Sequence, residues 1–272
     1  MTSSQASHQK QDEPHVRPGC EAWSSAGQGE RRKTGILLVH GFTGSPASLR
    51  PLAEMLARRG FAVELVRLPG HGTQLREILP TRYDDWRAAV VAAGRELAAR
   101  TERQFIVGLS LGGTLSLDAA SSALTPAGVV TINAQILNRE GFAIKLGPLI
   151  ERILPIVPPQ MAGLTPNDIA KPETDEQAYT WVPTAAGNSI VRALSRVRDQ
   201  LPRLGCPVLV MYSANDHSVP PENSKALLQL IDRKWTEELV LERSYHVATL
   251  DYDLELIEEK IASFVDRIAG AS

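Results

Sequence analysis

Short apolar runs alternate with amphipathic segments of helical periodicity over most of the chain. Runs typical of buried strands occur at residues 36–40, 61–68, 104–107, 128–133, 207–212 and 238–241. Segments that predict helices lie at residues 46–59, 83–100, 113–123, 221–231 and 254–268. Strands that alternate with helices form parallel sheets with helices on both faces. The pattern therefore predicts an α/β fold with a mostly parallel sheet.

Residues 134–189 interrupt this alternation. The interval is rich in proline, and its apolar stretch at residues 150–157 predicts a helix that the sheet does not need. An insertion after the strand at residues 128–133 would lie above the carboxyl edge of the sheet. We therefore expect a small cap or lid, able to open and close over a site at that edge. Candidates for its apolar wall are Ile153, Leu154, Ile156 and Met161.

The chain has 272 residues, of which 43% are hydrophobic. This length and composition allow one large core, so we expect a single domain at residues 31–272. Residues 1–30 are polar, and their first part carries too little apolar surface to offset the entropy of ordering. We expect them to form a disordered tail, within which residues 21–23 could pack as a short edge segment.

A glycine-flanked serine, Gly108-Leu109-Ser110-Leu111-Gly112, lies between an apolar run and a helical segment. This is the setting of a nucleophile elbow, a strained turn that projects the serine Oγ and needs nearly side-chain-free residues on both sides. The start of the following helix also leaves amides free, so that of Leu111 is a candidate oxyanion donor. The motif predicts Ser110 as a nucleophile, with a purely structural turn as the alternative.

A serine nucleophile needs a base, and an acid that orients the base. Asp216 follows the apolar run at residues 207–212, and His246 follows the run at residues 238–241. The carboxyl ends of parallel strands meet at one edge of a sheet, where ligands of α/β sheets bind. We therefore expect Ser110, Asp216 and His246 to converge there as a catalytic triad.

A tetrahedral intermediate needs a second donor, and the loop after the strand at residues 36–40 offers one. Gly41 and Gly44 leave the backbone room to turn, so that the amide of Phe42 can point inward while its ring lines an acyl pocket. The alternative is that Phe42 serves only the core. We expect another bulky residue at this position to keep the donor and alter mainly the chain-length preference.

Five segments carry a resemblance to a known family. They are His40-Gly41-Phe42-Thr43-Gly44, Pro69-Gly70-His71-Gly72, Gly108-Leu109-Ser110-Leu111-Gly112-Gly113, Asn215-Asp216-His217-Ser218-Val219-Pro220 and Ser244-Tyr245-His246-Val247. Over about residues 35–268 the chain resembles bacterial carboxylesterases and monoacylglycerol lipases of the α/β-hydrolase superfamily. The resemblance implies a serine esterase with Ser110, Asp216 and His246 as nucleophile, acid and base, and with the two oxyanion donors named above. Thr180 and Trp181 depart from it, because relatives often carry Asp and a polar residue there, and this departure affects the substrate pocket rather than the triad.

Other histidines and acids compete for these roles. His217 is adjacent to Asp216, and a neighbouring loop residue usually points away, so we do not expect it to be the base. We expect structural roles for the remaining candidates: His40 and His71 in loops, Asp251 and Asp253 as caps or first-turn anions of the helix at residues 254–268, and Asp118 as a solvated or salt-bridged helix residue.

Composition narrows the possible partners. The net charge is −2 and no basic block occurs, so we expect neither nucleic acid nor an anionic membrane surface as a partner. Cys20 and Cys206 show no metal-ligand spacing and no disulfide framework, so we expect no metal, no cofactor and a reducing cytoplasm. The first residues do not resemble a signal peptide, and no apolar run is long enough for a membrane span. We expect a monomer or weak homodimer that acts on a small-molecule ester.

The expected reaction is acyl transfer from an ester to water, with short- to medium-chain esters, monoacylglycerols among them, as substrates. Activity should rise with pH as His246 loses its proton, near pH 6.5 unless neighbouring groups shift it. The triad does not fix the substrate, so an acyltransferase, a carbon–carbon bond hydrolase or a peptidase are alternatives. A non-catalytic ligand-binding protein is a further alternative from another class. The modest aromatic content and small cap give no sign of a large lipid-docking surface, which disfavours lipase action on emulsions.

Overall fold

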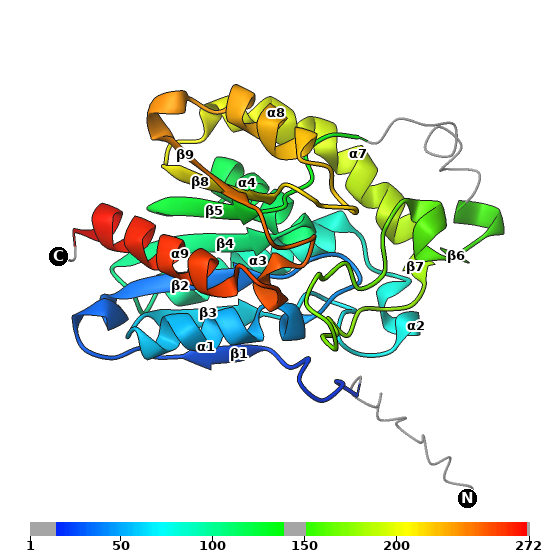
Figure 1. The fold of residues 1–272 in the computed structure, drawn as a ribbon, viewed down its shortest axis with the longest axis horizontal. Helices are drawn as coiled ribbons and strands as arrows, with labels where there is room; N and C mark the ends of the chain where they lie inside the picture. The colour runs from blue at the N-terminus through cyan, green and yellow to red at the C-terminus, as the bar shows by residue number, and fades with distance from the viewer. Residues whose placement is uncertain (1–14, 139–150, 271–272) are drawn as a thin grey trace, which may run out of the picture.

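The computed structural model describes residues 15–138 and 151–270. Its centre is a seven-stranded sheet of order β1-β3-β2-β4-β5-β8-β9 (Figure 1). All neighbouring strands are parallel except β1, which runs antiparallel to β3. The strands are β1 Trp23–Ser25, β2 Thr34–Val39, β3 Ala62–Val66, β4 Arg103–Leu109, β5 Gly128–Ile132, β8 Val208–Ser213 and β9 Thr236–Leu241. The expected mostly parallel sheet is confirmed, with strand ends shifted by a few residues.

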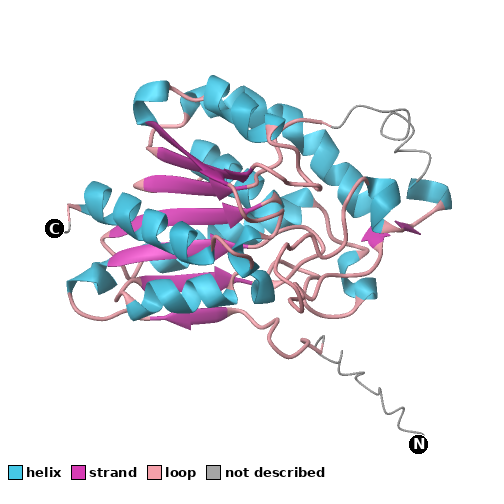
Figure 2. Ribbon diagram, viewed as in Figure 1, coloured by secondary structure: helices cyan, strands magenta, loops and turns pink. Residues whose placement is uncertain are grey.

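Helices cover both faces of this sheet, as expected (Figure 2). Strand residues point alternately to opposite faces, so Leu37 and Val39 enter one core while Ile36 and Leu38 enter the other. The first core is closed by α3, α4, α7 and α8, and the second by α1 and α9. The helices are α1 Arg50–Arg58, α2 Leu75–Ile78, α3 Tyr83–Ala98, α4 Leu111–Ser122, α7 Thr184–Gln200, α8 Glu222–Leu230 and α9 Leu254–Ala269.

Helix α7 is absent from the sequence-based expectations. Its buried face nevertheless shows helical spacing, with Ile190, Ala193, Leu194 and Val197 turned toward the sheet. The preceding proline-rich interval masks this periodicity. The irregular part of the insertion therefore ends at β7 (Val182–Pro183), and the chain returns to the sheet through a regular helix.

The described part of the insertion, residues 151–183, has little regular structure. It contains a two-stranded antiparallel pair, β6 (Ile156–Val157) with β7, and a 3₁₀ turn at Pro159–Ala162. The helix expected at residues 150–157 is wrong beyond residue 153, because Pro155 lacks an amide donor and Pro158 favours extended backbone before it. Residues 184–189 of the expected cap form the start of α7, and residues 139–150 lie outside the described residues.

The amino-terminal segment corrects a second expectation. Residues 15–30 are packed rather than disordered, and β1 extends the sheet at the edge where residues 21–23 were expected to pack. The amide of Arg17 donates to the carbonyl of Gly72, and its guanidinium donates to the carbonyl of Gln177. The side chain of Cys20 is fully buried. These long-range contacts supply the stabilisation that the segment's own composition lacks, whereas residues 1–14 lie outside the described part.

No helix within residues 15–138 and 151–270 combines the length and the apolar character that crossing a membrane requires.

Candidate active site

Ser110 occupies a strained turn between β4 and α4. Its φ of 56° and ψ of −121° lie outside the regions that L-residues commonly adopt, and its amide donates to the carbonyl of Ile132 at 2.8 Å. A Cβ at Gly108 would overlap the carbonyl of Gly112, and a Cβ at Gly112 would overlap the carbonyl of Val39. Both glycines are therefore required for close backbone packing, and together they leave the serine side chain projecting from the turn.

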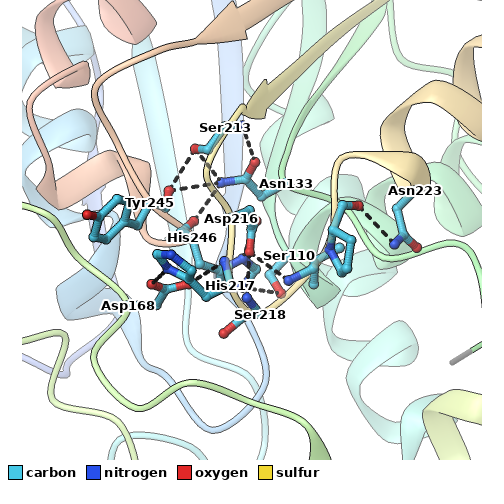
Figure 3. Close-up of polar contacts among 12 residues, drawn as sticks. Ser110, Asn133, Asp168, Ser213, Asp216, His217, Ser218, Asn223, Tyr245 and His246 are labelled. Atoms are coloured by element: carbon cyan, nitrogen blue, oxygen red, sulfur yellow. Dashed lines mark hydrogen bonds and ion pairs between the residues drawn. The ribbon is translucent and has the colours of Figure 1, made fainter.

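The three side chains singled out in the sequence are in direct contact (Figure 3). The Oγ of Ser110 lies 2.9 Å from Nε2 of His246, and Nδ1 of His246 lies 2.7 Å from Oδ2 of Asp216. The other carboxylate oxygen, Oδ1, accepts the amides of Ser218 at 2.8 Å and Val219 at 2.6 Å. Because Asp216 is held by its own loop, its free oxygen can orient the imidazole ring.

Asn133, which the sequence reasoning missed, connects the strand ends beneath this contact. It directly follows β5, has a positive φ of 51°, and accepts the amide of Ser213 at 2.7 Å. Its Nδ2 donates to the carbonyls of His246 at 2.7 Å and Tyr245 at 3.3 Å. One side chain thus joins the ends of β5 and β8 to the loop after β9. The signal in the sequence was an Asn directly after a buried strand, a residue type that tolerates positive φ.

The surroundings of His246 oppose and support its protonation at once. Burial lowers its pKa, but the negative charges of Asp216, Glu176 and Asp168 and the hydrogen bond that the ring donates to Asp216 raise it more. The pKa of His246 therefore lies above its ordinary value of 6.5. The neutral ring, which can accept a proton from Ser110, predominates only at correspondingly higher pH.

A pocket opens at Ser110 and His246, and Phe42 and Leu111 line it. The main chain of Gly41 passes directly beside the serine, since a Cβ there would lie 3.2 Å from the Cβ of Ser110. The ring of Phe42 packs on Trp86 with centroids 5.5 Å apart. The loop after β2 and the start of α4 thus both border the space in front of the serine hydroxyl.

The opposite wall comes from the insertion, but not from the residues expected there. Leu164, Thr165 and Glu176 line the pocket. The four apolar candidates, Ile153, Leu154, Ile156 and Met161, are not among its lining residues, and Ile153 and Met161 are 69% and 63% exposed. Ile156 belongs to β6, and the other three lie close to it in sequence. Figure 1 shows the β6 and β7 pair near the amino-terminal end of α7, away from the ends of the sheet strands.

Glu176 is the second site residue that the sequence did not reveal. Burial raises the pKa of its carboxyl to about 6, although the positive charge of His246 opposes this. Its carboxylate lies close to the loop after β2, because a Cβ at Gly44 would lie 3.7 Å from its Oε2. In the sequence Glu176 stands in a short polar run, Thr174-Asp175-Glu176-Gln177, that resembles an ordinary solvated loop.

The two buried histidines behind the pocket have structural contacts, as expected. Nδ1 of His40 lies 2.9 Å from the carbonyl of Gly41, and its Nε2 accepts the amide of Leu68. Burial lowers the pKa of His40 to about 4, so this ring is neutral. The ring of His71 is also buried and lies 3.1 Å from the carbonyl of Pro69. His217 points away from Asp216 and contacts Asp168 instead.

The remaining acids fall into two groups. Asp118 is a buried helix residue that forms a salt bridge with Arg87. Of the two expected roles, the salt-bridged one is therefore confirmed and the solvated one is wrong. Asp253 is the N-cap residue of α9, as expected, but its side chain makes no capping hydrogen bond, and the expected capping role is wrong for Asp251. Asp253 accepts the amide of Arg243 instead, and Asp251 holds loop amides. Within residues 15–138 and 151–270 no group of three or more His, Cys, Asp and Glu side chains is arranged to hold a metal ion.

The fold and the serine–histidine–aspartate contact together define a hydrolase of the α/β class. The model of the alpha/beta hydrolase family matches residues 36–259. The chain therefore belongs to this family, which confirms the resemblance read from its motifs.

Particular relatives narrow the comparison. A thermostable monoacylglycerol lipase of Bacillus sp. (strain H-257) is 39% identical over 241 residues, which cover 89% of this chain and 94% of the relative. A carboxylesterase of Bacillus subtilis (strain 168) is 25% identical over 240 residues, 86% of this chain and 92% of the relative. A structure from work on LipS and LipT, two metagenome-derived lipolytic enzymes, has a TM-score of 0.85 at 37% identity. The match covers 93% of this chain and 100% of the chain in that structure. These relatives confirm the expected class, a carboxylic ester hydrolase.

Proposed function

We propose that this chain hydrolyses carboxylic esters through an acyl-enzyme on Ser110, and that monoacylglycerols are its substrate class. The observation that carries the reaction is the unbroken series of contacts from Ser110 through His246 to Asp216. The substrate class is supported by the lipase and esterase relatives and by the carboxylate of Glu176 in the pocket.

The proposed first half-reaction transfers the acyl group to the enzyme. His246 takes the proton of Ser110 as the oxygen attacks the ester carbonyl, and Asp216 holds the ring and stabilises its positive charge. The amides of Phe42 and Leu111 stabilise the oxyanion, a contribution worth about 10²- to 10³-fold per donor. His246 then gives its proton to the leaving alcohol. Ser110 remains esterified by the acyl group.

The proposed second half-reaction releases the acid. Water enters where the alcohol left, His246 takes one of its protons, and the resulting hydroxide attacks the acyl carbonyl. The tetrahedral intermediate collapses to the carboxylic acid, and the proton returns to Ser110.

The reaction needs no redox group, and we propose that the enzyme works in the reducing cytoplasm as a monomer or weak homodimer, where thiols such as Cys20 and Cys206 stay free.

The alcohol part of the substrate is the point at which Glu176 enters. A monoacylglycerol differs from a simple alkyl ester by two free hydroxyls on the leaving alcohol. A carboxylate in a pocket sheltered from water accepts hydrogen bonds from hydroxyls strongly, and an alcohol lacking them would leave it unpaired. We propose that Glu176 binds the glycerol hydroxyls and thereby favours monoacylglycerols over alkyl esters of equal acyl length.

Two variants test the proposal. Ser110→Ala should abolish hydrolysis of both monodecanoylglycerol and p-nitrophenyl decanoate. Glu176→Gln should lower the ratio of kcat/KM for monodecanoylglycerol to that for p-nitrophenyl decanoate about tenfold, because one charge-assisted hydrogen bond is weakened. The matched control is Glu173→Gln, an exposed carboxylate of the same segment, which should leave the ratio unchanged.

Different failures contradict different parts of the proposal. Retained hydrolysis in Ser110→Ala would overturn the acyl-enzyme. An unchanged ratio in Glu176→Gln would overturn the glycerol-binding role while leaving the esterase reaction intact. A p-nitrophenyl ester series from acetate to palmitate then measures the acyl preference, for which we expect short to medium chains to react fastest.

A further inference from the structure

One buried residue of the insertion touches both loops that carry the proposed acid and base. The amide of His217, the residue directly after Asp216, donates to Oδ2 of Asp168 at 3.0 Å. The amide of Val247, the residue directly after His246, donates to the main-chain carbonyl of Asp168 at 3.0 Å. Asp168 thus bonds the residue directly after Asp216 and the residue directly after His246. The 2.7 Å contact between Asp216 and His246 orients the base.

The carboxylate of Asp168 is fully engaged and sheltered. Its Oδ1 lies 2.7 Å from Nδ1 of His217, and its side chain is only 2% exposed, whereas that of His217 is 52% exposed. The imidazole of His217 stacks edge-on against Tyr245, with centroids 4.5 Å apart. Figure 3 shows Asp168 and His217 directly beside the contact of His246 with Asp216. The exposed ring therefore covers a carboxylate that bonds the acid loop twice.

Further bonds join the same stretch of the insertion to both loops. The amide of Thr165 donates to Oγ of Ser218 at 3.0 Å, on the acid side. On the base side, the carboxylate of Asp251 accepts the amides of Ala170 at 2.7 Å and Tyr245 at 2.9 Å. Residues 165–170 are therefore bound to the loops after β8 and β9, and Asp168 is the member that contacts both.

We propose that Asp168 is a positioning residue, which holds the loop of Asp216 against the loop of His246 and so fixes the base relative to Ser110. The inference rests on the proposed function, because it assigns no reaction of its own. Asp168 does not touch the reacting atoms and acts only through its two neighbours. A displacement of about 1 Å in such a group costs about 10²-fold in rate, so one hydrogen-bonded residue between two loops can have a large effect.

Asp168 also contributes charge. The ionisable groups around His246 are Asp216 across the hydrogen bond, Glu176 and Asp168 from the insertion, and His217 and Asp251 behind them. The negative charge of Asp168 favours the protonated imidazole. Its loss would disfavour that form and would therefore lower the pKa of His246.

Two substitutions separate geometry from charge. Asp168→Asn keeps an oxygen for the amide of His217 and supplies an N–H that can donate to the His217 ring, so kcat should stay within about threefold of the natural protein. Asp168→Ala removes both side-chain bonds to His217 and leaves the main-chain bond to Val247, so kcat should fall about 10- to 100-fold with KM nearly unchanged. Glu173→Gln is the matched control for the loss of an exposed carboxylate from the same insertion, and it should change neither quantity.

The pH profile supplies a readout that a purely structural role would not move. In Asp168→Asn the acid limb of kcat/KM for p-nitrophenyl acetate should move about half a pH unit lower, because protonated His246 loses a stabilising charge. Glu176 titrates in the same range, so the comparison is repeated between Glu176→Gln and the double variant with Asp168→Asn. The same displacement is expected in both backgrounds.

Active-site labelling with a fluorophosphonate keeps the test decisive if Asp168→Ala is unstable. The final stoichiometry counts folded sites, and the rate of labelling reports how well His246 activates Ser110. Slow labelling at full stoichiometry supports positioning. A normal labelling rate in Asp168→Ala, or an unmoved acid limb in Asp168→Asn together with a loss of kcat equal to that of Asp168→Ala, overturns it. Absent labelling of the natural protein would instead refute the proposed nucleophile.

Discussion

The carboxyl edge of the sheet and the insertion that faces it are built in different ways. The proposed catalytic side chains follow strands of the sheet that backbone ladders join. Ser110 and Asp216 follow β4 and β8, whose residues are almost entirely buried, whereas His246 follows the edge strand β9, of which only Leu241 is buried. Residues 151–183 instead contain two-residue strands, and three of their non-glycine residues, Asn167, Glu173 and Gln177, have positive φ. Figure 2 shows mostly loop where the insertion meets the strand ends. A rigid edge fixes the chemistry, while an irregular segment shapes the space for substrate.

Side-chain hydrogen bonds fix much of the insertion, whereas backbone hydrogen bonds join the strands of the sheet. Oδ1 of Asn167 accepts the amide of Glu176 at 3.0 Å, and its Nδ2 donates to the carbonyl of Thr174 at 2.6 Å. The hydroxyl of Tyr179 donates to the carbonyl of Gly70 at 2.7 Å. Single side chains thus place whole stretches of loop. Apart from Asp168, which contacts the loops of the proposed acid and base, residues of the insertion should therefore affect selectivity more than the chemical step when they are substituted.

The largest expected effect belongs to the sheet edge. Ser110→Ala should lower kcat on any ester about 10⁵-fold, because the proposed nucleophile is removed. Its thermal unfolding midpoint should stay near that of the natural protein, since Ser110 serves no core contact. Steady-state rates and circular dichroism measure the two quantities. Substantial residual turnover by the purified variant would mean that Ser110 is not the nucleophile and that the sheet edge does not carry out the chemical step.

A glycine substitution tests how tightly this edge is packed. Gly112→Ala places a methyl group against the carbonyls of Val39 and His40, which are backbone atoms of the adjoining strand end. We expect a loss of about 3 to 5 kcal/mol in the free energy of unfolding, or failure to fold. Gly205→Ala is the control, because a Cβ there meets nothing within 4 Å. Equal denaturation midpoints for the two variants would show that the elbow tolerates displacement.

The pH dependence tests the charges that the two regions share. His246 must be neutral to accept the serine proton, and Asp216, Glu176 and Asp168 raise its pKa above 6.5. Activity on p-nitrophenyl acetate should therefore rise with pH, with its half-maximum above pH 6.5, and should fall as the ring becomes protonated below it. A profile that is flat from pH 5 to 9 would contradict the role of His246.

The smallest effect should come from the wall of the insertion. Leu164→Ala enlarges the pocket on that side, so the ratio of kcat/KM between p-nitrophenyl decanoate and acetate should change about threefold to tenfold. The rate on acetate alone should change little. Met161→Ala, at an exposed site outside the pocket lining, is the control. A large loss on acetate in Leu164→Ala would mean that this wall of the pocket, and not Asp168 alone, affects the chemical step.

Local sequence was sufficient for the sheet edge and insufficient for the insertion. The run before Ser110, the two glycines beside it and the acid and histidine after later strands all carry signals within a few residues. The helical spacing of the apolar residues of α7 is present in the sequence as well, but the proline-rich interval before it hides this pattern. Glu176 and Asp168 carry no such signal, because their importance comes from burial and from partners far along the chain.

The sequence by itself determined the parallel sheet, the elbow and the order of the three catalytic candidates. The reason is that strand burial, tight turns and strand-end loops depend on neighbouring residues. Only the tertiary structure decided what faces Ser110 across the pocket, that residues 15–30 are packed, and that Asp168 joins two loops. Those features depend on contacts between residues as far apart as Arg17 and Gln177, and no local pattern records which distant partner will supply the missing hydrogen bond.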